Sequence, residues 1–244
     1  MVRPRRLDAR RVLGIGPRAS LGEAGEVTVS LTPADRAATW NAVFERTVAG
    51  HRSWDGAVLA WSRELLERAD PDRASVVDVG SGESVLVDSL IADGWQRITL
   101  LDVSAVALAR VKDRLALVER ADGVRQVRNA VDFVVSDVLA WQPVDVYTAW
   151  FDRAVLHFLT DPADREAYVA VASRALRPGA GLVLGGFAPD GPETCSGLPV
   201  ARRTAEELAA EFAPHFTLEE SWRHVHATPS GAEQVFTWVL LRRG

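Results

Sequence analysis

The segment Val76-Val77-Asp78-Val79-Gly80-Ser81-Gly82 combines two patterns that together predict the fold and the position of a ligand site. The run from Ala74 to Val79 is short, apolar and β-branched, and turn-forming residues bound it, as is typical of a buried parallel strand. The two glycines that follow allow the backbone to approach a ligand closely, and the next helix offers free N–H groups. The segment therefore predicts a strand, a glycine loop and a helix, with a ligand at the loop.

Downstream of this loop, helical and strand patterns alternate, which demands a parallel sheet with helices on both faces. Near the end, Ala227-Thr228-Pro229-Ser230-Gly231 joins two strands into an antiparallel hairpin. We therefore expect an α/β fold, a doubly wound, mostly parallel seven-stranded sheet with a C-terminal antiparallel hairpin. The expected strands are 74–79, 97–101, 131–136, 144–150, 181–187, 217–224 and 234–241, the helices are 84–93, 104–119, 162–176 and 205–212, and Arg177-Pro178-Gly179 is a stop between helix and strand.

Upstream of the first strand, apolar residues recur at helical spacing from Ala34 to Arg68, with an interruption at 51–56. We expect residues 31–70 to form an N-terminal helical cap or lid and residues 74–244 to form a Rossmann-like core, so that 31–244 is a single domain. Residues 1–30 are expected to be a disordered extension of a bacterial chain. Six arginines in the first 22 residues leave an organelle transit peptide as the alternative.

The composition excludes several classes of function. Of the 244 residues, 48% are hydrophobic and 25% are charged, as in soluble globular proteins, and the formal net charge of −5 gives no reason to expect nucleic acid as a partner. No stretch approaches the roughly 20 apolar residues that span a membrane, so no membrane partner is expected. With one cysteine, Cys195, and five histidines, neither a disulfide nor a metal site is expected, which fits a cytoplasmic protein.

Acidic residues follow the next two predicted strands, at the edge of the sheet where doubly wound folds bind ligands. A carboxylate at Asp102 can accept from two vicinal ribose hydroxyls, and Asp137 follows the third strand. Val85 stands where a dinucleotide fingerprint needs its third glycine, and the sole lysine, Lys112, lies inside a helix rather than in a phosphate loop. The pattern that remains is typical of a site for a nucleoside without phosphates.

This combination resembles the class I, seven-stranded methyltransferases that use S-adenosylmethionine (SAM) and release S-adenosylhomocysteine (SAH). The resemblance covers about Ser75 to Arg243. It implies that the glycine loop holds the methionine part of SAM, that Asp102 holds the ribose, and that Asp137 reads the adenine amino group. The cofactor-binding residues implied in this way are Gly80, Ser81, Gly82, Asp102, Val103, Asp137 and Val138.

Three further strings resemble a narrower, bacterial branch near the thiopurine-methyltransferase-like and protein-lysine methyltransferases. They are Asp152-Arg153-Ala154-Val155-Leu156-His157-Phe158-Leu159, Phe187-Ala188-Pro189-Asp190-Gly191-Pro192 and Cys195-Ser196-Gly197-Leu198-Pro199. Related enzymes carry a tryptophan in an upstream helical turn that contacts the cofactor, which implies this role for Trp54. Those relatives often have histidine where this chain has Phe151.

The candidates for catalysis follow the fourth core strand, where the acceptor meets the cofactor in this fold. Asp152 and His157 are the candidate bases, and Arg153 is expected to orient the acceptor or the carboxylate of the cofactor. Asp152 as a helix N-cap and His157 as a core histidine are the structural alternatives. Cys195 lies in a loop that is expected to form a wall of the acceptor pocket.

Methyl transfer from SAM is an in-line displacement that needs alignment more than acid–base machinery, so the sequence specifies the cofactor better than the acceptor. We expect transfer to an O, N or S nucleophile of a small molecule. A protein-lysine methyltransferase and a SAM-binding module without turnover are the alternatives. The chain is expected to act as a monomer or homodimer.

Overall fold

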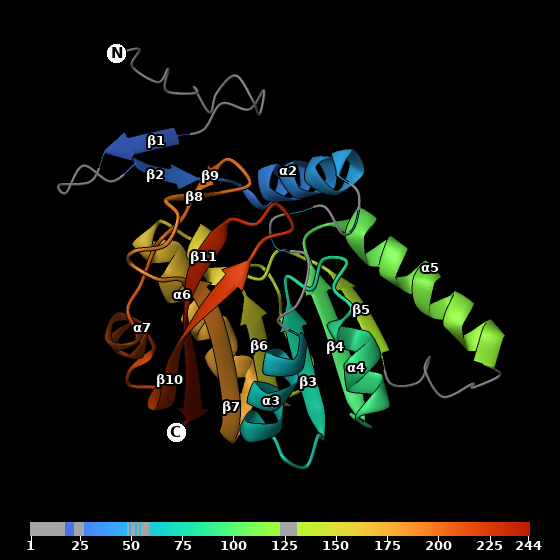
Figure 1. The fold of residues 1–244 in the computed structure, drawn as a ribbon. Coiled ribbons are helices and arrows are strands. Elements are labelled where there is room, and N and C mark those ends of the chain that lie inside the picture. Colours follow the sequence, from blue (N-terminus) through green and yellow to red (C-terminus); the bar gives the residue numbers. More distant parts are fainter. Residues whose placement is uncertain are drawn as a thin grey trace.

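The structure is a computed structural model, and it describes residues 18–21, 27–47, 49, 52, 54, 59–122 and 131–244. At its centre is a seven-stranded sheet in the order β10-β11-β7-β6-β3-β4-β5 (Figure 1). The strands from β7 to β5 are parallel, and β11 pairs antiparallel with both β7 and β10. The strands are β3 (Ser75–Val79), β4 (Arg97–Asp102), β5 (Val131–Val135), β6 (Tyr147–Arg153), β7 (Leu176–Phe187), β10 (Phe216–Ala227) and β11 (Glu233–Arg243).

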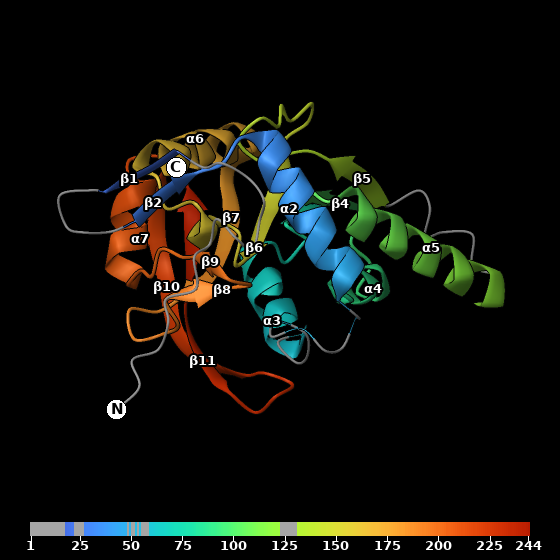
Figure 2. The same cartoon turned by 90° about the horizontal axis from the view of Figure 1, so that it is seen from above.

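Helices cover both faces of this sheet, because successive residues of each buried strand point to opposite sides. Val77 belongs to one apolar core with residues of α6 and α7, whereas Val76 belongs to the other with residues of α3, α4 and α5. Seen from above in Figure 2, α6 and α3 lie on opposite sides of the sheet. The predicted doubly wound sheet is therefore confirmed. The helices are α3 (Leu59–Ala69), α4 (Leu86–Ala92), α5 (Ala105–Asp122), α6 (Pro162–Ala175) and α7 (Ala205–Phe212).

The helix α2 (Pro33–Arg46) lies across the carboxyl ends of the parallel strands (Figures 1 and 2). It begins at a capping box, in which Thr32 Oγ1 accepts from the Asp35 N–H and the Asp35 carboxylate accepts from the Thr32 N–H. Its Phe44 is buried. It lies within residues 31–70, for which the sequence predicts a cap or lid, and is called the lid helix below. The other helix of that segment, α3, packs against the sheet as part of the core.

Smaller elements complete the fold. Two short antiparallel pairs are present, β1 (Arg18–Leu21) with β2 (Val27–Ser30) and β8 (Thr194–Cys195) with β9 (Leu198–Pro199), and the 3₁₀ turn η2 (Leu156–Phe158) follows β6. The first pair lies within the segment expected to be an extension, of which residues 1–17 and 22–26 are outside the described residues. None of the helices in the described part of the chain is long and apolar enough to cross a membrane.

Two strands start at least three residues away from their predicted first residue. The strand expected from Val144 begins at Tyr147, because Val144 and Val146 are 95% and 58% exposed and the chain enters the sheet only after them. The expected stop at 177–179 lies within β7, which starts directly after α6. Leu176 pairs with Tyr147 and Gly181 pairs with Ala149, so the residues between them form an irregularity inside the strand rather than a separate turn.

Candidate functional site

A cavity of about 380 Å³ lies at the carboxyl ends of β3, β4, β5 and β6, beneath α2. This is where a doubly wound sheet binds ligands, and the volume is within the range of small-molecule sites. All the predicted cofactor-binding residues line it, including the residues next to the strand-end acids. They are Trp54, Gly80, Ser81, Gly82, Asp102, Val103, Asp137, Val138 and Arg153.

The glycine loop has a backbone that only glycine adopts easily. Gly80 and Gly82 have φ angles of +63° and +53°. A Cβ on Gly80 would lie 2.0 Å from Val155 Cγ2, and one on Gly82 would lie 3.0 Å from the Phe44 ring. The loop is therefore packed between Val155 and the lid helix: a side chain at Gly80 would clash with Val155, and one at Gly82 would displace the Phe44 ring.

Asp102 holds this loop in place through its carboxylate. One oxygen accepts from the Gly82 N–H at 2.7 Å, and the other accepts from the Ser104 N–H at 2.7 Å. Burial raises the pKa of Asp102 to about 6, although these backbone N–H groups lower it. Each carboxylate oxygen has a second lone pair, so Asp102, which lines the cavity, can order the loop and still accept from ribose hydroxyls.

Asp78 and Ser81 carry polar atoms that find no partner within the described structure. Asp78 Oδ2 and Ser81 Oγ are both buried, accept or donate no hydrogen bond, and belong to residues that line the cavity. Burial raises the pKa of Asp78 to about 8, against the opposing charge of Arg153. Because buried polar atoms in native proteins are normally paired, these two atoms are suited to a ligand that donates hydrogen bonds. From the sequence alone, Asp78 is expected to order this loop through backbone hydrogen bonds rather than to contact a ligand.

Asp137 lines the cavity and also forms an ion pair with the lid helix. Its Oδ1 accepts from the Leu139 N–H at 2.9 Å, and its Oδ2 forms an ion pair of 2.9 Å with Arg36 of α2. Arg36 also pairs with Asp164 of α6 at 2.5 Å. No signal in the sequence pointed to Arg36, because its partners are more than 100 residues away along the chain.

Aromatic rings line the cavity from the lid side. Trp54 meets Trp40 edge to face, with ring centroids 6.2 Å apart, and also meets Phe44 at 6.4 Å. Trp40 then contacts Phe158 of η2 at 5.0 Å. Only Trp54 was predicted to be a site residue from the sequence.

Asp152 and His157, the candidate bases, do not line this cavity. The buried Asp152 carboxylate accepts from the Val155 and Leu156 N–H groups at 2.7 and 3.0 Å and from the Tyr168 hydroxyl at 2.5 Å. Burial raises its pKa to about 6. This arrangement is that of a capping aspartate, because each oxygen holds the turn that follows β6.

His157 is buried beside a separate cavity of about 20 Å³, with its ring 4.4 Å from that of Phe158 and 4.9 Å from that of Phe187. Burial lowers its pKa to about 3, so the ring is neutral at physiological pH.

Arg153 and Cys195 do line the main cavity. Burial raises the pKa of the Cys195 thiol to about 11, which keeps it protonated. Within the described ranges, no group of acidic, histidine and cysteine side chains could hold a metal ion.

Comparisons with known proteins agree with this geometry. Residues 76–179 match the family model described as a methyltransferase domain. No curated protein matches the chain in sequence. Among solved structures, 1,6-didemethyltoxoflavin-N1-methyltransferase from Burkholderia thailandensis superimposes with a TM-score of 0.65 at 20% identity, over 92% of this chain and 98% of that one.

Two other solved structures share the fold. The N-methyltransferase NodS from Bradyrhizobium japonicum has a TM-score of 0.61 at 17% identity, over 84% of this chain and 98% of its own. The [4+2]-cyclase SpnF has a TM-score of 0.64 at 18% identity, over 88% and 97% of the two chains. At these identities, the likenesses establish the fold alone.

The matching domain, the sheet order and the position of the cavity agree with the class I SAM-dependent methyltransferase predicted from the sequence. Residues 76–179 are similar to the methyltransferase domain family, and SAM is the cofactor predicted for this cavity. The residues present fit that cofactor: the glycines leave room for it, and unpaired Asp78 Oδ2 and Ser81 Oγ offer polar contacts beside the loop that is expected to hold its methionine part.

Proposed function

We propose that SAM lies across the ends of β3, β4 and β5 and that the acceptor is a small molecule held over the ends of β6 and β7. In this proposal the glycine loop holds the methionine part, with Asp78 Oδ2 and Ser81 Oγ facing its ammonium group. Asp102 accepts from the ribose and Asp137 from the adenine amino group. The position of each carboxylate at a successive strand end supports this assignment.

The charge of the cavity favours a small-molecule acceptor over a lysine side chain. The acidic residues that line the cavity in the described structure are Asp78, Glu83, Asp102 and Asp137, and all of them lie near the carboxyl ends of β3, β4 or β5. On the β6 and β7 side, the described lining is aromatic or apolar, apart from Arg153, Thr160 and Cys195. An ammonium group would find no carboxylate there to balance its charge, so this observation carries the proposal.

The reaction itself makes modest demands on these side chains. The sulfonium of bound SAM supplies an activated methyl group, and the protein aligns the acceptor with it and excludes water. Trp40 and Phe158 form an apolar wall for that purpose. The acceptor atom, whether O, N or S, brings its own lone pair, and a base is needed only if that atom arrives protonated.

We further propose supporting roles for the two predicted bases. Asp152 fixes the turn that presses Val155 against Gly80, and His157 packs behind Phe158. Neither role needs contact with the acceptor. Arg153, which lines the cavity, is the candidate to orient the acceptor or the carboxylate of SAM.

Transfer of radiolabel distinguishes the three functions. The protein is incubated with methyl-labelled SAM and a bacterial cell extract, which is then separated into small molecules and proteins by ultrafiltration. The proposal predicts label in the small-molecule fraction, in a species other than SAM. Label retained on a protein band would contradict it and favour the lysine methyltransferase, and SAM binding with no transfer to either fraction would favour a binding module.

A further inference from the structure

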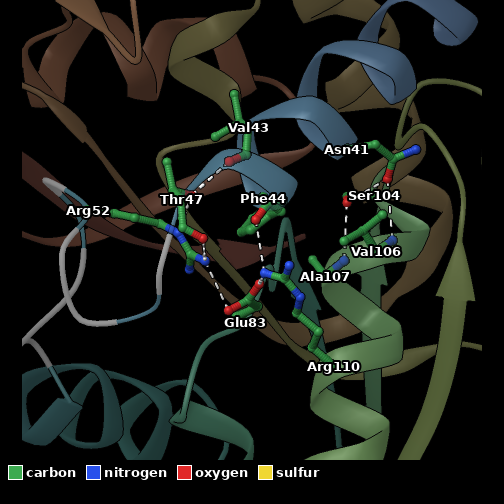
Figure 3. A network of polar contacts seen from close by, with 10 residues as sticks. All are labelled: Asn41, Val43, Phe44, Thr47, Arg52, Glu83, Ser104, Val106, Ala107 and Arg110. Carbon is green, nitrogen blue, oxygen red and sulfur yellow. Dashed lines mark hydrogen bonds and ion pairs between the residues drawn. The ribbon is translucent and has the colours of Figure 1, made fainter.

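Glu83 follows the two glycines of the loop and is held by two arginines from different parts of the molecule (Figure 3). Its Oε2 accepts from Arg52 at 3.0 Å, and its Oε1 accepts from Arg110 of α5 at 2.6 Å. The Glu83 side chain is 10% exposed and that of Arg52 is 1% exposed. The pair of Glu83 with Arg52 is therefore shielded from water and stronger than a surface pair, whereas Arg110 is 44% exposed. Through the two pairs, Glu83 joins the loop to both segments.

The same two arginines also hold the end of the lid helix. Arg110 donates to the Phe44 carbonyl at 2.9 Å, and Arg52 donates to Thr47 Oγ1 at 2.8 Å (Figure 3). The Arg52 guanidinium lies over the Phe44 ring, 4.9 Å from its centroid. Because the Phe44 ring covers Gly82, the glycine loop packs directly against the end of α2. Glu83 lies between Arg52 and Arg110, which contact both parts.

The position of α2 also determines the wall of the acceptor pocket. Trp40 lies one helical turn before Phe44, and its ring contacts Phe158 on the β6 side of the cavity. A shift of the end of α2 therefore moves Trp40 relative to Phe158. The ion pairs of Glu83 therefore affect the acceptor side of the cavity through the position of α2.

We propose that Glu83 is a positioning residue that couples the glycine loop to α2, so that cofactor bound at the loop fixes the lid and completes the acceptor wall. This inference rests on the proposed cofactor site. Glu83 acts through Arg52 and Arg110 rather than on the reacting atoms. Coupling between two sites is reciprocal, so the acceptor binds better after the cofactor than before it.

The variant Glu83→Gln tests this coupling, and Glu211→Gln is its matched control. Glu211 also bridges two arginines, Arg165 at 2.8 Å and Arg203 at 3.2 Å, but it joins α7 to α6 rather than to the lid. The measurements are the Kd for SAH and the hydrogen-exchange protection that SAH gives to residues 33–46. Glu83→Gln is expected to raise the Kd about tenfold and to abolish the protection. Glu211→Gln is expected to change neither, even if its Tm falls.

Full protection of residues 33–46 in Glu83→Gln, together with a Kd like that of the wild type, would overturn the coupling. A wild-type protein that binds no SAH would instead overturn the cofactor site. If Glu83→Gln does not fold, Arg110→Gln is the second variant. It removes one of the two ion pairs of Glu83, and it is milder because the Arg110 side chain is 44% exposed. It is expected to lower the protection of residues 33–46, and unchanged protection there would overturn the proposal equally.

Discussion

At the scale of single residues, the site depends on places where no side chain fits. Gly80 combines a left-handed backbone with a contact that leaves no space, since a Cβ there would lie 2.0 Å from Val155 Cγ2. Val155 cannot retreat easily, because the Asp152 carboxylate holds its N–H. The glycine loop and the turn after β6 therefore fit each other only with glycine at this position.

Gly80→Ala is expected to destabilise the fold and to prevent SAH binding. Gly94→Ala is the matched control, because Gly94 also has a positive φ, +83°, but a Cβ there would meet nothing within 4 Å. The control should therefore cost about 1 kcal/mol of unfolding free energy from backbone strain alone, and Gly80→Ala should cost at least about 2 kcal/mol more. Denaturant unfolding and SAH titration check both values, and equal losses in the two variants would contradict the packing argument.

His157 makes a prediction about the dependence of stability on pH. Burial lowers its pKa from 6.5 to about 3 in the folded protein, so between these pH values the unfolded chain binds a proton that the folded chain does not. The stability associated with neutral His157 is present above pH 6.5 and is lost as the pH falls towards 3, by up to about 1.4 kcal/mol per pH unit.

The variant His157→Phe removes this titration while keeping a ring against Phe158 and Phe187. As the pH is lowered from 6.5 towards 4, its unfolding free energy should fall less steeply than that of the wild type. The difference between the two proteins is the quantity to measure, because the raised pKa values of Asp78, Asp102 and Asp152 act in the opposite sense in both. Parallel curves would show that His157 titrates normally.

At the scale of elements, contacts near the start and the middle of the lid helix α2 join it to the core. Near its start, Arg36 bridges Asp137 and Asp164, and near its middle the Asn41 side chain accepts from Ser104 Oγ at 2.8 Å. These contacts join the lid to the end of β5, to α6 and to the start of α5. The lid is therefore attached at the strand ends that we assign to the cofactor.

Arg36→Ala is expected to loosen α2 and to weaken SAH binding severalfold, because Asp137 loses the cation that orients it. Arg46→Ala in the same helix is the control, since Arg46 is exposed and donates to the Ala42 carbonyl of its own helix. Limited proteolysis reports the state of the lid, and calorimetric titration reports the Kd. If both variants behave alike, the bridge of Arg36 does not hold the lid.

At the scale of the whole molecule, the sequence predicted what depends on local pattern. The helix at 205–212 was placed correctly, because the capping box of Thr204 and Glu207 marks its start. The cofactor loop and the acids Asp102 and Asp137 could be placed together, because parallel strands end at one edge of the sheet. The start of β6 differs from the prediction because exposed Val144 and Val146 are β-formers that pair with no neighbouring strand.

The parts of the site that the sequence did not predict arise from the docking of α2. Arg36, Phe44 and Glu83 belong to no local motif, and they meet their partners only after the lid has packed across the strand ends. Asp152 and His157 show the opposite case: they lie near the carboxyl end of β6 but line the small second cavity instead of the main one. Position after a strand predicts the neighbourhood of a side chain but not the direction in which it points.

The central claim, that this cavity binds SAM through the acids at its strand ends, is tested most directly by titrating SAH into the wild type and Asp102→Asn in a calorimeter. The account predicts binding at one site per chain in the wild type. In a folded Asp102→Asn protein it predicts affinity at least about tenfold weaker, because the variant loses a charged acceptor for the ribose. No binding by the wild type up to about 1 mM SAH, or equal affinity in the two proteins, would contradict it.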